Sequence, residues 1–217
     1  MNSRKPKVLF VSHCAQLSGA ELVLCDVVTS YSESSSIFLF EDGPLRARVE
    51  AAGLGVAVGR GLERLLRVRR TGGIGAAIRC VDAICWTAVR LARMARDYEL
   101  IYANSQKAFI ISGLAALLTR RPLIWHLHDI MTLEHFGWKQ IRVAVGLANA
   151  IAARVIVPSG AVADAFIIAG GREQKVRIVP NGVSVPPGTR LLEREALRSE
   201  LGLPEGFLIC VAGRLAP

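Results

Sequence analysis

The stretch R-V-I-V-P-S-G-A-V-A-D-A-F-I-I-A-G-G-R-E-Q-K-V-R-I-V-P-N-G-V, residues 154–183, decides the fold of this chain. Its β-branched residues fall into two short runs, at 155–157 and 176–179, which are typical of strands in a parallel sheet. Between them lies an apolar helical stretch that Ser159 can cap and that Gly170 and Gly171 can end. The order strand, helix, strand predicts a βαβ unit in which both strands end at the same edge of the sheet.

Two segments at that edge are candidate ligand-binding loops, because open α/β folds bind ligands outside the carboxyl ends of their strands. The first segment begins at Ser159. The second is a tight turn predicted over Pro180, Asn181 and Gly182.

The same alternation of strands and helices is expected over most of the chain. Further strands are expected at residues 7–12, 36–40, 55–58, 100–104 and 122–127. Helices are expected from about Gly19 and at residues 45–52, 74–96, 107–119 and 138–153, with a charged helix at 191–201 and a lone strand at 207–212. We therefore predict an α/β domain over 1–185, a linker with a short helix over 186–206, and the first strand of a truncated second domain over 207–217.

Composition limits the class of protein. With 217 residues, of which 52% are hydrophobic, the chain can bury a sizeable core, and global disorder is excluded. The net charge of +9 favours anionic partners. Five cysteines without a C-x-x-C pair indicate reduced thiols in a cytosolic protein. The apolar run at 8–11 is too short for a signal peptide, and charged residues interrupt 74–92, so neither is a membrane span.

A loop after the first strand offers a second candidate site. Ser18 and Gly19 leave room for a ligand to approach the backbone, and the start of the following helix favours an anion, although a plain helix cap explains the same residues equally well. The dinucleotide fingerprint G-x-G-x-x-G is absent here, which disfavours a nicotinamide or flavin dehydrogenase.

The sequence H-L-H-D at 126–129 provides candidate chemistry at the end of the fifth strand. Alternation along a strand points His126 and His128 to the same side. A zinc site would need a third ligand, which the sequence does not offer clearly, so we expect no metal. A His beside Asp129 also matches the way in which enzymes orient an imidazole for hydrogen bonding.

A basic segment precedes and includes the long helix at 74–96. Its arginines, on a helix with apolar spacing, fit either a solvated helix face or attachment to an anionic membrane surface. Few aromatic residues interleave with them, so we expect no nucleic-acid partner. The arginines that precede the helix are Arg60, Arg64, Arg67, Arg69 and Arg70.

Six short motifs agree in order and spacing with one known family. Together they show that the chain resembles the family 4 glycosyltransferases of the GT-B fold. The motifs are S-G-A-E at 18–21, H-D at 128–129, V-P-S at 157–159, P-N-G-V at 180–183, and L-G-L-P at 201–204 followed by V-A-G-R-L at 211–215.

The resemblance implies a Rossmann-like parallel sheet with helices on both faces, the N-terminal domain of a GT-B enzyme. Such enzymes have two Rossmann-like domains facing a cleft, the first for the acceptor and the second for the nucleotide-sugar donor, and they need no metal or other cofactor. The implied acceptor and phosphate residues are Ser18, Gly19, Ala20, Glu21, Ser159, Asn181 and Gly182. His128, with Asp129 beside it, would lie by the transferred sugar, and Arg214 would contact the donor diphosphate.

Two departures from the family pattern matter. Ser18 stands where the family usually has glycine, which would narrow the approach of a phosphate. The lysine expected after Arg214 and a later pair of glutamates lie beyond Pro217. The resemblance therefore implies a chain that is inactive alone and depends on a donor-binding domain. The chain would then be either a fragment of a longer gene product or one subunit of a split enzyme whose donor-binding domain is a separate chain.

Three functions fit these features. The first is the acceptor-side half of a retaining, metal-independent glycosyltransferase in polysaccharide biosynthesis. It would move a sugar from a nucleotide-diphosphate donor to a glycan or lipid-linked acceptor, in the cytoplasm or peripherally on the inner face of the cytoplasmic membrane. The second is a non-catalytic module that binds an anionic glycan or a membrane surface. The third is a flavodoxin-like nucleotide-binding protein.

Overall fold

The computed structural model describes residues 4–31, 34–59, 62, 80–182, 194–204 and 206–209. The chain divides into two units, Met1–Gly182 and Val183–Pro217. The α/β architecture lies in the first unit, and the described part of the second contains the helix α9 (Arg194–Glu200). The arginines predicted to form a basic patch at 60–70, the first residues of the helix expected at 74–96, and Arg214 lie outside the described residues.

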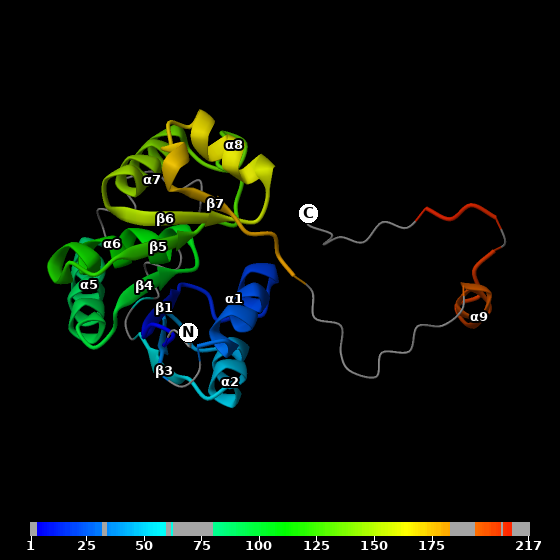
Figure 1. Ribbon diagram of the computed structural model, residues 1–217, viewed down its shortest axis with the longest axis horizontal. Coiled ribbons are helices and arrows are strands. Elements are labelled where there is room, and N and C mark those ends of the chain that lie inside the picture. The colour runs from blue at the N-terminus through cyan, green and yellow to red at the C-terminus, as the bar shows by residue number, and fades with distance from the viewer. Residues whose placement is uncertain are drawn as a thin grey trace. The chain divides into compact units, whose positions relative to one another are not determined.

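One parallel sheet forms the centre of the first unit. In its described part, seven strands lie in the order β3-β2-β1-β4-β5-β6-β7, and every neighbouring pair is parallel (Figure 1). The strands are β1 (Val8–Ser12), β2 (Ser36–Leu39), β3 (Gly55–Val58), β4 (Leu100–Ala103), β5 (Leu123–His126), β6 (Ala152–Val157) and β7 (Val176–Ile178). The prediction of an α/β fold on a parallel sheet is confirmed. The order reverses between β1 and β4, which makes this pair the topological switch point.

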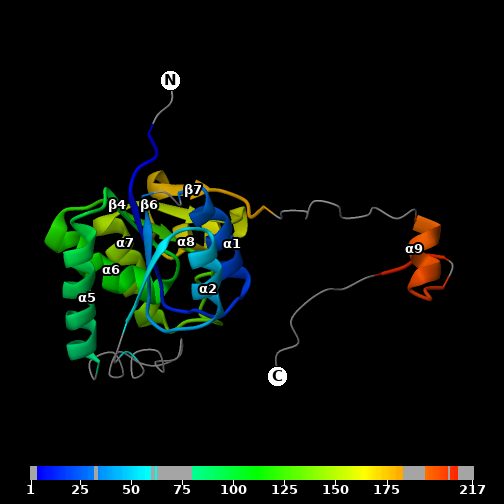
Figure 2. The ribbon, with the colours of Figure 1, turned by 90° about the horizontal axis from the view of Figure 1, so that it is seen from below.

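Helices cover both faces of the sheet. The helices α1 (Gly19–Thr29) and α2 (Pro44–Ala51) lie on one side. The other side carries α5 (Val81–Ala95), α6 (Gln106–Thr119) and α7 (Trp138–Ile151), as Figures 1 and 2 show. Buried residues of α8 (Gly160–Ile168) belong to the same core cluster as those of α5 to α7. Two helix layers follow from the reversal of strand order, because parallel crossovers are right-handed.

The core consists of one cluster under each helix layer. In the larger one, the fully buried ring of Trp125 stacks on Phe109 of α6 with ring centroids 4.4 Å apart. Gly113 brings α6 and α7 close together, since a Cβ at this position would lie 2.6 Å from Ile151 Cδ1. The packing of this cluster therefore combines aromatic stacking on β5 with a close approach of α6 and α7 at Gly113.

Three local predictions were wrong. The helix expected to reach residue 153 ends at Ile151, because Ala152 already pairs with Leu123 of β5. No turn forms over 180–182, since the chain continues beside β6 with the Val179 N–H donating to Val157 O at 2.9 Å. The described part of the strand expected at 207–212 is not a strand. A lone strand leaves its backbone groups unpaired, and the side chain of Phe207 is 94% exposed.

A row of rings lies on the α1 face of the central strands. Phe10 of β1 lies 5.3 Å from Tyr102 of β4, which lies 5.7 Å from His126 of β5. His126 is 3% exposed, and its Nδ1 lies 2.6 Å from the Tyr102 hydroxyl. Burial lowers the pKa of His126 to about 3, with a smaller contribution from His128, and burial raises the pKa of Tyr102. Both side chains are therefore neutral at pH 7.

The low pKa of His126 predicts that acid destabilises the fold. The unfolded chain binds this proton near pH 6.5 and the folded chain only near pH 3. The free energy of unfolding should therefore fall as the pH drops below about 6.5, by up to about 1.4 kcal/mol per pH unit from this group. When the free energy of unfolding is measured by urea titration at pH 8, 6.5 and 5, it should depend less on pH in His126→Gln than in the unmodified chain. His135→Gln, at an exposed position, is the control, and an unchanged pH dependence in His126→Gln would contradict the assignment.

Candidate functional site

The candidate site lies along the edge of the sheet where the parallel strands end. Ser18–Glu21 follow β1, His128 and Asp129 follow β5, Ser159 follows β6, and Asn181 and Gly182 follow β7. All of these residues therefore lie toward the same edge of the sheet. The switch point between β1 and β4 lies at this edge, and it is the usual place for a ligand in an open α/β fold.

The start of α1 differs from those of α6 and α8. Ser105 and Ser159 cap their helices, with Oγ accepting from the Ala108 N–H at 3.1 Å and from the Val162 N–H at 3.4 Å. Ser18 occupies the same position before α1, but its hydroxyl donates to the carboxylate of Glu21 and does not cap the backbone. The cap predicted at Ser159 is confirmed.

Open space surrounds Gly19, the first residue of α1. The residue is exposed, and a Cβ added to it would meet no atom within 4 Å. Glu21, in the first turn of the helix, is 3% exposed. The first-turn N–H groups of α1 thus have no side-chain cap and lie beside an exposed glycine, which suits the approach of an anion.

A buried amide connects this helix start to the histidines. The Asn104 side chain follows β4 and is completely buried. Its Nδ2 donates to the backbone carbonyl of Ala20 at 3.2 Å, and its Oδ1 lies 3.1 Å from His128 Nε2. Residues from the ends of three neighbouring segments, after β1, β4 and β5, therefore form one hydrogen-bonded group.

The two histidines lie on the same side of the sheet, as alternation predicted, with ring centroids 3.9 Å apart. Burial lowers the pKa of His128, and the negative charge of Asp129 offsets this only in part. The imidazole of His128 is therefore neutral at pH 7. Asn104, directly after the neighbouring strand β4, is placed to orient this ring, in addition to the adjacent Asp129 that the sequence indicated.

The remaining predicted residues lie farther along the edge. Ser159 serves as the N-cap of α8 beyond β6. Asn181 and Gly182 are exposed and follow β7, two strands away from β5. The structure thus joins Ala20 to His128 through Asn104, whereas Ser159, Asn181 and Gly182 follow strands farther along the sheet.

Asn104 and Tyr102 were not predicted as site residues. Both were included only in a predicted strand at 100–104. A signal was available, because Asn104 is a polar residue directly after a buried strand. In the described part of the chain, no group of three or more His, Cys, Asp and Glu side chains is arranged to hold a metal ion.

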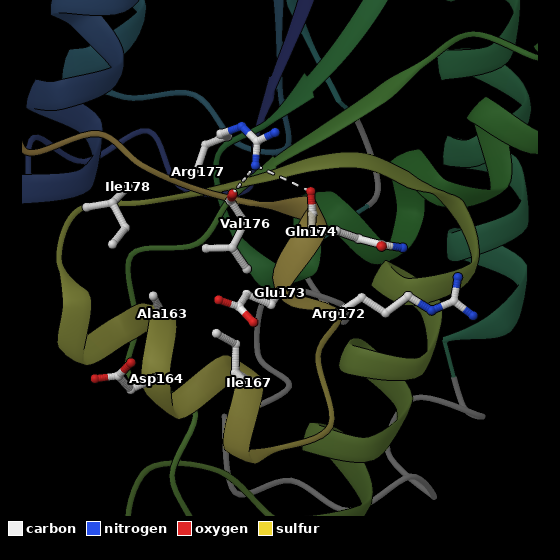
Figure 3. Close-up of a pocket in the computed structure, with 9 residues that line it drawn as sticks. All are labelled: Ala163, Asp164, Ile167, Arg172, Glu173, Gln174, Val176, Arg177 and Ile178. Carbon is white, nitrogen blue, oxygen red and sulfur yellow. Dashed lines mark hydrogen bonds between the residues drawn. The ribbon is translucent and has the colours of Figure 1, made fainter.

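The structure also has an open hollow of about 950 Å³ beside the edge strand β7 (Figure 3). Its apolar wall comes from α8 and β7, and Arg177 Nη1 donates to Val176 O at 2.7 Å and to Gln174 O at 3.3 Å at its rim. None of the predicted site residues lines it. The residues that line it are Ala163, Asp164, Ile167, Arg172, Glu173, Gln174, Val176, Arg177 and Ile178.

Solved structures similar to this chain include the Anabaena protein Alr3699/HepE in complex with UDP-glucose. That protein is 33% identical, the match covers 91% of this chain and 50% of the other, and the TM-score is 0.69. A glycosyltransferase from Rickettsia africae, 13% identical over 93% of this chain and 50% of the other, has a TM-score of 0.57 and supports the fold alone. Among curated proteins, none matches the chain. The chain spans about half the length of the HepE chains it matches.

A family model agrees with this structural likeness. The model for Glycosyltransferase Family 4 matches residues 40–185, which include the end of β4, His128 and the βαβ unit of 154–183. In the described residues, no helix is both long enough and apolar enough to cross a bilayer. On the basis of the matched family model, the chain belongs to glycosyltransferase family 4, with the GT-B type of Rossmann-like domain.

Proposed function

We propose that this chain is the acceptor-side half of a retaining glycosyltransferase. It would transfer a sugar from a nucleotide-diphosphate donor to a glycan or lipid-linked acceptor in polysaccharide biosynthesis. The observation that carries the proposal is the hydrogen-bonded group of Ala20, Asn104 and His128 at the switch point of the sheet. The UDP-glucose complex of HepE, at 33% identity, supports a nucleotide sugar as the donor.

The chemistry that such a group supports is electrostatic. When the bond between sugar and diphosphate breaks, positive charge develops on the sugar ring and negative charge on the leaving diphosphate. The uncapped first turn of α1 has a partial positive charge suited to the diphosphate, and His128 with Asp129 would lie by the sugar. Ser18 and Glu21 would shape the approach to this turn, and no metal or other cofactor is assigned a role.

A second half would complete the site. Since the chain spans about half the length of HepE, we propose that a donor-binding domain, in the same protein or a separate chain, supplies the remaining contacts. In this proposal, Arg214 contacts the donor diphosphate, Asn181 and Gly182 mark the crossing between the domains, and Ser159 lies on the acceptor side. The described domain alone would then not transfer sugar.

A second role, attachment to an anionic membrane surface, has its own support on α5. Trp86 and Val89 of this helix are 54% and 42% exposed, and the Arg90 guanidinium lies 5.7 Å from the centre of the Trp86 ring. The helices α5, α6 and α7 carry five basic residues and one acidic residue, whereas α1 and α2 carry two basic and three acidic residues. An aromatic and cationic face on one helix layer suits the interface of an anionic bilayer, at the inner side of the cytoplasmic membrane.

The catalytic role of His128 is tested by replacing it in a complete enzyme. The chain is fused to the second half of Anabaena HepE. Transfer from UDP-glucose is measured for this fusion and for the chain alone, without the added half. We expect His128→Ala to lower kcat about 100-fold with little change in KM, because its contact is made in the transition state. His135→Ala, at an exposed position, is the control. Unchanged turnover in His128→Ala would remove this role, and full activity of the chain alone would contradict the need for a second half.

Membrane attachment is tested with vesicles. The unmodified chain should float with vesicles rich in phosphatidylglycerol and not with neutral vesicles. Salt at about 0.5 M should release it, because salt at this concentration screens surface charges. Trp86→Ser combined with Arg93→Glu should abolish flotation. Arg48→Glu on α2, which makes the same change in charge in the other helix layer, should leave it unchanged. Equal flotation of both variants would contradict the assignment to α5.

A further inference from the structure

The side chain of Asn104 has a defined orientation because one of its partners can act in only one way. A backbone carbonyl only accepts hydrogen bonds, so the Ala20 carbonyl requires the NH₂ group of the amide. The amide oxygen must then face His128. This orientation follows from the partners themselves and does not depend on distinguishing oxygen from nitrogen at Asn104.

The orientation of the amide fixes the proton on His128. An amide oxygen only accepts, so His128 Nε2, at 3.1 Å, must be the donor and must carry hydrogen. In a neutral imidazole, the other ring nitrogen then has no hydrogen and can only accept. Burial supports the neutral ring, because it lowers the pKa of His128.

The surroundings of the ring favour a fixed orientation. One neighbour is the ring of His126, at a centroid distance of 3.9 Å, which is itself bonded to Tyr102 through Nδ1. Asn104 is completely buried, so neither of its hydrogen bonds can be replaced readily by water. Rotation of the His128 ring would leave the amide oxygen of Asn104 buried without a partner, which is unfavourable.

We propose that Asn104 is a positioning residue, which holds His128 as the Nε2–H tautomer and couples it to the start of α1. His128 Nδ1 is thereby presented as a hydrogen-bond acceptor for a hydroxyl group of the sugar. This last step rests on the proposed function, whereas the tautomer and the coupling to Ala20 do not. A ligand that shifts the start of α1 would also change the hydrogen bonding of His128, because the same amide bonds both.

The tautomer is measured directly by NMR of the chain labelled with ¹⁵N-histidine. The chain has four histidines, and His→Gln variants assign their signals. At pH 7.5 we expect His128 to show a protonated Nε2 and an unprotonated Nδ1. In Asn104→Ala the two ring nitrogens should shift toward averaged values, because both tautomers become populated. A wild-type ring that carries hydrogen on Nδ1, or one unchanged by Asn104→Ala, would overturn the proposal.

Two further variants keep the test decisive. Asn149 is a matched control, since both ends of its amide are also hydrogen-bonded, in this case to backbone groups: its Nδ2 donates to Gly170 O at 2.8 Å and its Oδ1 accepts from the Arg172 N–H at 2.9 Å. Asn149→Ala should leave His128 unchanged. If Asn104→Ala does not fold, Asn104→Asp replaces it. The carboxylate should keep hydrogen on His128 Nε2 and move the titration of His128 to higher pH. Titration at the same pH as in the unmodified chain would overturn the proposal.

Activity distinguishes this inference from the proposed function. In the fusion with the second half of HepE, Asn104→Ala should lower kcat, and adding it to His128→Ala should cause no further loss, since Asn104 acts through His128. Additive losses would overturn the positioning role. A fusion without any transfer activity would instead refute the proposed function, while the NMR result would still decide the role of Asn104.

Discussion

The buried amide of Asn104 is the interaction on which the site depends. It joins Ala20 and His128, which lie 84 residues before it and 24 residues after it in the sequence. A completely buried amide is unfavourable unless its hydrogen bonds are made. The start of α1 and the segment after β5 are therefore connected through the side chain of a third segment, Asn104 after β4.

The topology of the sheet makes this contact possible. Because β4 pairs with β1 and with β5, a residue directly after β4 lies between the segments that follow those strands. The same reversal places α1 and α6 in opposite helix layers, so their first turns diverge above this point. Asn104 fills the position between them, next to a helix whose own serine does not cap it.

The sequence allowed the strands, most helices and the family to be predicted, since each depends on local pattern. Buried β-branched runs marked the strands, and Ser159 marked the start of α8. Ser18 resembled a cap of the same kind, but its hydroxyl donates a hydrogen bond to the buried Glu21 carboxylate and does not cap the helix backbone. The end of α7 was misplaced because Ala152 suits a helix, and only pairing with Leu123 makes it a strand residue. The role of Asn104 depends on partners far away in sequence, which no local pattern reveals.

Because both histidines are neutral, the hydrogen bond made by His128 and the positive field of the α1 backbone are two distinct contributions at the sheet edge. The first-turn N–H groups of α1 already supply partial positive charge, beside the carboxylate of Glu21 in the same turn. Two protonated rings with centroids 3.9 Å apart would repel each other. Burial keeps both neutral, so His128 can provide a directed hydrogen bond while the helix backbone provides the favourable field for an anion. A site arranged in this way stabilises separated charges without adding a cation that would have to be neutralised when no ligand is bound.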